Sequence, residues 1–560
     1  MSQLATPSLI FIILLYILLL TIGIWTAKKM THLRADELLV NGRNLNAAVA
    51  AIAITASAVA GRFISQIAET VYDTTSINGG LIWCQEPLAT AISLLIGGLL
   101  FASPMRSKNY LTVLDPCSER YGAIMAGVLF IPLALYEFVS MGASLSYFGD
   151  ILFRHSFLNI GHAPVFFICV GATSVSITYC FLGGIRSVVY TDVAKVAIIF
   201  CGLWIFAPCA LANYNFVRCI RLTFDQWLGH LPPVYGGVYF DNYIVAITCG
   251  LVCQSYFQRI LSVRNANQAR IASMLAAVLC ILIAAPSALI GAVGKSTDWN
   301  RTEIGHSPTD KEIPFIFNTV LQTLTPPVIA SVAIGVIAVA TISAFDNSLL
   351  SLSTMFVSNV RPAFVRSYKS EKQHIRWFKV CVINCGVIGT ALGCVVLPYR
   401  GIKLLLTDII STAVFPQLVC ALFVPKCNGY GSLSAIGLTT IARLLFGEPS
   451  LSRHLTVVRL PLYNADLDVQ LFPYRSVLLL VSLASTVLFS KLATYGFVKS
   501  RKVPIRFDFL HVFDRSVPDL LSTVNSVPMR DQIFDSQESV AAERTKHPAS
   551  IQIKNQSVCV

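Results

Sequence analysis

Long apolar stretches, separated by short polar segments, fill the first 498 residues of the chain. A membrane-spanning helix needs roughly 20 consecutive apolar residues to cross about 30 Å of hydrocarbon. The pattern predicts thirteen such helices, at residues 9–27, 46–70, 79–103, 121–149, 163–184, 188–212, 238–259, 270–294, 328–358, 376–398, 403–424, 428–446 and 474–498. We therefore expect a membrane domain over 1–498. Residues 499–560 are polar and aperiodic, which predicts a mostly disordered tail.

Composition and charge agree with this picture. Hydrophobic residues make up 55% of the chain and charged residues 13%, and the mean hydropathy is +0.67. These values exclude a disordered protein, a nucleic-acid-binding protein and an ordinary soluble enzyme. The basic residues behind the net charge of +13 gather in loops such as 28–44 and 359–376. Because basic loops stay on the cytoplasmic side, we expect an integral plasma-membrane protein with its N-terminus outside and its C-terminus in the cytoplasm.

Sequence motifs for catalysis or metal binding are missing. The chain has no G-x-S-x-G, H-E-x-x-H, Walker A or C-x-x-C motif, and its nine histidines all fall outside the predicted spans. The sequence therefore predicts neither an enzyme nor a bound cofactor. Asn300-Arg301-Thr302, in a predicted outer loop, is a glycosylation sequon. In the tail, Asp519-Leu520-Leu521 is a candidate signal for trafficking adaptors.

Charged residues inside the predicted spans are candidates for functional residues, because placing each charge at the bilayer centre costs roughly 2.5–3.5 kcal/mol. The candidates are Arg62, Glu69, Glu86, Glu137, Asp346 and Asp408. The second span surrounds Gly61 and Arg62 with small residues, which permit local unwinding that frees backbone carbonyls for a cation. The ninth span carries several hydroxyls beside Asp346, and oxygen ligands suit sodium. Alternatively, those hydroxyls bond to carbonyls of their own helix.

Several motifs resemble the sodium/solute symporter family, and within it the choline-transporting branch. They are PMRSK (104–108), LDP (114–116), GGIRSVVYTDV (183–193), YFQR (256–259), STDWNRT (296–302) and FPQLVCALFV (415–424). The resemblance covers about residues 9–498. It implies an all-α polytopic membrane protein with a five-plus-five inverted-repeat (LeuT-like) core. The repeats would be about 46–212 and 238–424, and the second and seventh spans would be broken around a midplane site.

The resemblance also implies a sodium site. Three of its ligands would be the backbone carbonyls of Ala56, Val59 and Ala340, and a fourth would be the hydroxyl of Ser343. The position of the family's second hydroxyl is Ala344 here, so four of five ligands remain.

The implied substrate site departs further from the family. Choline is a quaternary ammonium, which aromatic faces hold by cation–π attraction. The matching positions are Ala58, Thr90, Ser140 and Cys253, and none is aromatic. Arg62 stands where the family has glycine.

Arg62 has four interpretations. It forms a buried pair with Glu86, it pairs with Asp346, it acts as a tethered cation that favours an anionic or zwitterionic solute, or it extends into a watery cavity with little consequence. Glu86 and Asp346 are thus candidates for coupling or gating. A local ion pair of Lys195 with Asp192 is also expected, because these residues lie three apart on one helix face.

Together these features predict a sodium-coupled secondary active symporter. It would import a small organic solute, choline in the first instance, by alternating access, with sodium as the co-transported ion. The alternative is a transport-dead or altered-substrate relative that acts as a sensor or partner protein. A third hypothesis is a sodium leak channel.

Overall fold

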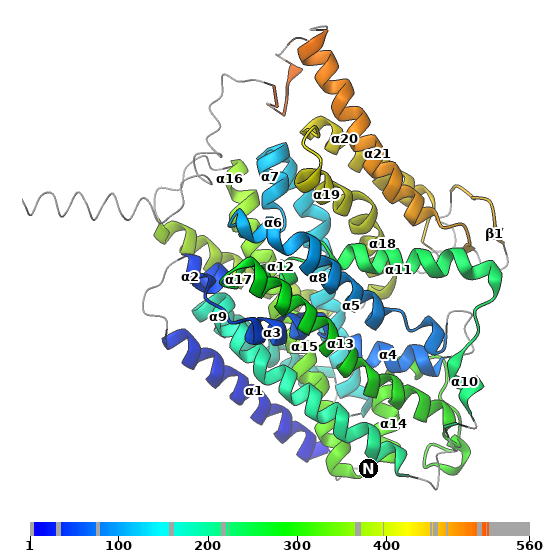
Figure 1. The fold of residues 1–560 in the computed structure, drawn as a ribbon. Helices are drawn as coiled ribbons and strands as arrows, with labels where there is room; N and C mark the ends of the chain where they lie inside the picture. Colours follow the sequence, from blue (N-terminus) through cyan, green and yellow to red (C-terminus); the bar gives the residue numbers. More distant parts are fainter. Residues whose placement is uncertain are drawn as a thin grey trace, which may run out of the picture.

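The computed structural model describes residues 5–29, 35–73, 79–155, 162–213, 220–221, 223–364, 371–395, 397–448, 451, 457–465, 469–500, 504, 507–510 and 512–513. These residues form a helical bundle with one short two-stranded hairpin (Figure 1). The helices of the first half are α1 (Ala5–Lys28), α2 (Ala35–Val40), α3 (Ala47–Ala58), α4 (Phe63–Tyr72), α5 (Glu86–Ile96), α6 (Ala102–Ser107), α7 (Asp115–Tyr121), α8 (Ala123–His155) and α9 (His162–Leu211).

The second half continues the bundle. Its helices are α10 (Phe224–Leu228), α11 (Gly236–Gly250), α12 (Gln254–Leu261), α13 (Ala266–Ser296), α14 (Ile316–Leu324), α15 (Pro327–Met355), α16 (Arg361–Phe364), α17 (Glu371–Gly393), α18 (Tyr399–Ile409), α19 (Phe415–Phe423), α20 (Gly429–Leu445) and α21 (Tyr474–Thr494). The strands β1 (Tyr463–Asn464) and β2 (Val469–Gln470) pair antiparallel. The π-helical segments η3 (Gly97–Phe101) and η8 (Ile410–Val414) join α5 to α6 and α18 to α19.

The membrane spans agree with the sequence pattern. Among the described residues, nine helices are long and apolar enough to cross a membrane, and two further helix pairs qualify as bent spans. Helix α9 has 50 residues, or about 75 Å at 1.5 Å per residue, which exceeds one crossing. Its backbone leaves helical geometry at Gly184, the last residue of the first of the two spans expected there. The total of thirteen stays a prediction, since α20 has 17 residues and is shorter than a typical span.

The two bent pairs are the second and seventh predicted spans. Helices α3 and α4 meet at 54°, and the segment ending in α11 meets α12 at 44°. The first break contains Gly61, whose φ of +67° is a conformation that favours glycine. The expectation that both spans are broken is confirmed.

Helix α15 is the centre of the bundle. In its most apolar window 83% of the residues are buried, the largest share among the candidate spans. It packs against α1, α8, α9 and α17. A helix buried on every side presents all its polar groups to protein rather than to lipid, so its hydroxyls and Asp346 must find partners inside the bundle.

A few residues of the predicted tail are described, and some of them contact α20. Asp508 accepts hydrogen bonds from the Tyr430 hydroxyl at 2.8 Å and from the Phe513 amide at 2.6 Å. The Phe513 ring stacks on Tyr430 of α20. The prediction of a mostly disordered tail stays a prediction, because most of residues 499–560 lie outside the described part of the chain. The candidate trafficking signal at 519–521 lies outside the described residues.

Candidate ion and solute site

A backbone hydrogen bond joins the break between α3 and α4 to α15. The Gly61 amide, which would bond within an unbroken helix, donates instead to the Ala340 carbonyl of α15 at 2.9 Å. A β-carbon on Gly61 would lie 2.6 Å from Ser144 Oγ, so only glycine fits here. The sequence puts small residues at this crossing, and the two backbones approach closely as a result.

Two of the four predicted sodium ligands, Ala56 and Ser343, are in contact at this crossing. Ser343 Oγ of α15 donates to the Ala56 carbonyl at the end of α3, at 3.2 Å. Ala56, Val59, Ala340 and Ser343 are all buried, at most 2% exposed. Two oxygens that bind one hard cation at right angles to each other lie roughly 3.3–3.7 Å apart. The Ala56 carbonyl oxygen and Ser343 Oγ are 3.2 Å apart, so little movement would let them bind one ion.

Some hydroxyls of α15 bond to carbonyls of their own helix, and others bond to neighbouring helices. Ser353 donates to the Leu349 carbonyl of its own helix at 2.8 Å, as the alternative hypothesis expects. Ser343 and Ser348 instead reach other helices, Ser348 donating to Glu137 Oε2 of α8 at 2.6 Å. Ala344 carries no ligand atom and borders the cavity described next.

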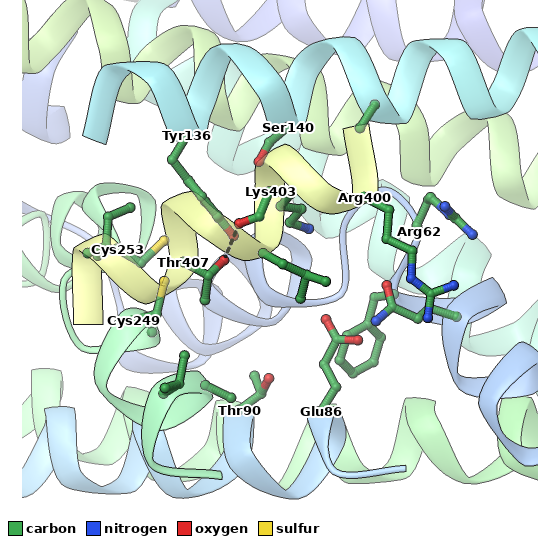
Figure 2. A pocket seen from close by; sticks show the side chains of 18 of the residues that line it. Arg62, Glu86, Thr90, Tyr136, Ser140, Cys249, Cys253, Arg400, Lys403 and Thr407 are labelled. Atoms are coloured by element: carbon green, nitrogen blue, oxygen red, sulfur yellow. Dashed lines mark hydrogen bonds between the residues drawn. The ribbon is translucent and has the colours of Figure 1, made fainter. Parts of the chain in front are cut away.

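All five predicted substrate positions line one cavity of about 1120 Å³. They are Ala58, Arg62, Thr90, Ser140 and Cys253, from α3, the first break, α5, α8 and the second break. Figure 2 shows Thr90 and Glu86 entering from one side and Ser140 and Tyr136 from the other. The cavity thus lies between the two broken helices, where the family resemblance places the solute.

Arg62 binds neither of its predicted partners. Its Nη2 lies 2.8 Å from Glu69 Oε2, and Arg400 Nη1 lies 3.2 Å from the other oxygen of Glu69. The predicted pairs with Glu86 and Asp346 are therefore wrong. Arg62 precedes α4, and Glu69 lies about two turns further along on the same face. The guanidinium also lies 4.6 Å from the centre of the Tyr147 ring.

Several polar atoms of the cavity wall have no hydrogen-bond partner among the described residues. Glu86 Oε2 and Ser140 Oγ are buried and accept or donate no hydrogen bond within the described part of the chain. Because an unpaired buried polar atom is costly, both are positioned for a group that the protein itself does not supply.

The cavity also holds a cation that the sequence reasoning passed over. Lys403, at the start of α18, reaches between α8 and α5 (Figure 2). Its Nζ lies 5.9 Å from the centre of the Tyr136 ring. It forms no ion pair with any residue that the structure describes. A lysine at the edge of a predicted span usually extends to the lipid surface, so the sequence carried little signal for this position.

Asp346 is buried behind the cavity and does not line it. Lys195 pairs with it and also with Asp192 Oδ1 at 3.1 Å, all three side chains being 0% exposed. The predicted pair of Lys195 with Asp192 is confirmed. The pair of Lys195 with Asp346 joins residues 151 positions apart in the chain, so no local sequence pattern predicts it.

A membrane bundle with two broken helices around a buried polar cavity is the architecture of a secondary transporter. The sequence profile of the sodium:solute symporter family matches residues 38–438, and the chain belongs to that family. It is 35% identical over 529 residues to "High-affinity choline transporter 1" of Torpedo marmorata, covering 90% of this chain and 88% of the relative. It is 34% identical over 532 residues to the human "High affinity choline transporter 1", covering 91% and 88%.

A solved structure confirms the fold. The substrate-bound outward-open state of a Na⁺-coupled sialic acid symporter superposes with a TM-score of 0.69 at 15% identity. The match covers 87% of this chain and 97% of that one.

Proposed function

We propose that the chain is a sodium-coupled symporter of the plasma membrane that imports a small organic cation of the choline type by alternating access. Its N-terminus would lie outside the cell and its C-terminus in the cytoplasm, where the tail would meet trafficking adaptors. Asn300 is exposed in the loop after α13 and would carry a glycan.

Sodium binding at Ala56, Val59, Ala340 and Ser343 would couple the ion to the solute. These residues join the α3–α4 break to α15, and Ala58 and Arg62 of the same break line the cavity. An ion that fixes the break therefore shapes the cavity wall. A bound ion stabilises whichever conformation presents all its ligands, which is how it would bias the alternation.

The observation that best supports a cationic solute is that Glu86 Oε2 has no hydrogen-bond partner in the described chain. Its Oε2 is buried beside the cavity without a partner, and the Ser140 hydroxyl faces the same space. A quaternary ammonium would be attracted to the carboxylate, and the hydroxyl of a choline-type solute would bond to Ser140. The relatives named choline transporters support the same assignment.

Uptake of radiolabelled choline into cells that express the chain tests the proposal. We expect saturable uptake that falls to background when N-methylglucamine replaces sodium. Glu86→Gln should lower choline affinity about tenfold, because it removes the charge that attracts the ammonium. Choline uptake that sodium does not change would overturn the sodium coupling, and no uptake of choline at all would overturn the substrate.

A second candidate is an altered, zwitterionic solute. Lys403 has no ion-pair partner in the described chain and lies in the same cavity as Glu86. An ammonium end of a zwitterion would then meet Glu86 and its carboxylate would meet Lys403. In competition experiments a betaine would displace choline under this hypothesis, whereas other quaternary ammonium alcohols would displace it under the first.

The lost aromatic positions can be tested by restoring one. Ala58→Trp combined with Arg62→Gly should raise choline affinity about 10- to 30-fold, since a dry cation–π contact contributes about 2 kcal/mol. Arg62 can be removed because Glu69 keeps Arg400 as its partner. Ala58→Leu combined with Arg62→Gly adds apolar volume without an aromatic face. An equal gain from the leucine variant would contradict the cation–π explanation.

A transport-dead sensor or a sodium leak channel remains the alternative class. The absence of a hydroxyl at Ala344 and of aromatics at the four cavity positions favours it. Solute uptake in the first experiment separates the symporter from both alternatives. Sodium current without any solute then separates the leak channel from the sensor.

A further inference from the structure

Four charged side chains are fully buried behind the sodium position, between α9, α12 and α15. They are Asp192 and Lys195 of α9, Arg259 of α12 and Asp346 of α15, each with a side chain that is 0% exposed. The two carboxylates and two cations sum to zero. Buried charges persist only when they are compensated in this way, so the charge of Lys195 is required by its surroundings.

The ammonium of Lys195 lies where a small cation would be coordinated. Asp192 Oδ1 is 3.1 Å away, Asp346 Oδ2 is in contact, and the Tyr179 ring centre lies 5.6 Å from Nζ. The Tyr179 hydroxyl donates to the same Asp346 oxygen. Two carboxylates supply the oxygen ligands that hard cations prefer, and one ring face adds cation–π attraction.

This cluster is continuous with the proposed sodium position. Asp346 and Asn347 follow Ser343 by three and four residues, so all three lie on one face of α15. Asn347 Nδ2 donates to Ser343 Oγ at 3.5 Å, and Arg259 Nη2 donates to Asn347 Oδ1. Arg259 Nη2 also lies 2.6 Å from Asp192 Oδ2.

One atom of the cluster points to a ligand independently of its charges. Asp346 Oδ1 is buried and has no hydrogen-bond partner in the described chain. Its carboxylate therefore retains an open coordination position next to the ammonium. Such an oxygen is costly to bury unless a cation can reach it.

We infer that the Lys195 ammonium is a tethered cation that fills a second monovalent-cation site, between Asp192 and Asp346 and beside Ser343. Removing its charge leaves the cluster with one net negative charge, which a sodium ion from solution can neutralise. The chain would accordingly couple its solute to one sodium ion fewer than it would with an uncharged residue at 195. This consequence for the number of coupled sodium ions rests on the proposed sodium coupling.

The test is thermal unfolding of the full-length protein in lipid nanodiscs. Sodium chloride would be titrated against N-methylglucamine chloride at constant ionic strength, for the parent and for Lys195→Gln. Without sodium the variant should melt below the parent, and sodium should restore it. We expect the Hill coefficient for sodium stabilisation to rise from about one in the parent to between one and two in the variant.

Two controls separate charge from packing. Lys195→Arg keeps the cation, so its sodium response should match that of the parent. Lys195→Gln combined with Asp346→Asn restores neutrality, so the second sodium response should disappear. A Lys195→Gln protein whose sodium dependence equals that of the parent would overturn the inference, and so would a second sodium response that survives in the double variant.

The outcomes also distinguish this inference from the proposed function. If the parent shows no sodium response but Lys195→Gln does, the tethered cation stands and the sodium coupling of the parent fails. If the parent responds to sodium and Lys195→Gln responds identically, the coupling stands and the tethered cation fails.

Discussion

Asp408→Asn should lower the free energy of unfolding by about 3–5 kcal/mol, because it removes the carboxylate that the buried guanidinium of Arg443 shares with the partly buried guanidinium of Arg475. Asp408 Oδ2 lies 2.7 Å from Arg443 Nη2 and 2.9 Å from Arg475 Nε. Arg443 also contacts Glu448 at 2.6 Å. The network joins α18, which borders the cavity, to α20 and α21. Chemical unfolding of the purified protein in detergent measures the loss.

Two further variants make this prediction specific. Lys108→Ala removes an exposed pair with Glu119, whose side chains are 54% and 50% exposed, and should cost less than about 1 kcal/mol. Asp408→Asn combined with Arg475→Met removes the surplus cation as well, so part of the stability should return. Unchanged stability of Asp408→Asn would mean that the two arginines find other compensation.

Ser343→Ala should raise the sodium concentration for half-maximal uptake roughly 10- to 100-fold, since a contact to a charged group contributes about 1.5–3 kcal/mol. Ser343 offers the one predicted side-chain ligand, and its Oγ already lies 3.2 Å from the Ala56 carbonyl. Ala344→Ser should act in the opposite direction by supplying a fifth ligand. The hydroxyl has space because residue 344 borders the cavity. Sodium titrations of solute uptake measure both.

The matched control for Ser343 is on the same helix. Ser353→Ala removes a hydroxyl that bonds to the Leu349 carbonyl of α15 itself, so sodium activation should be unchanged. If Ser343→Ala leaves sodium activation unchanged while Ser353→Ala alters it, the proposed ion position is wrong.

The family motifs predicted which residues line the cavity better than they predicted the charges and ion pairs within it. All five substrate positions inferred from the resemblance line one cavity, because motifs fix the register of each helix and register fixes which residues face inward. Lys403 was missed because its neighbours resemble a span boundary. The partner of Arg62 was misassigned, since helical spacing within α4 decided it rather than proximity of neighbouring spans.

The sequence by itself indicated which stretches are long and apolar enough to cross a membrane, because hydrocarbon thickness imposes a minimum apolar length. The family resemblance predicted which two of them are broken, and the small residues around Gly61 permit the first break. Only the tertiary structure decided how the buried charges pair. Lys195 meets Asp346 across 151 residues and Arg259 meets Asp192 across 67. Such pairs form because burial forbids an uncompensated charge, and the packing of helices, rather than the order of residues, determines which opposite charge is near.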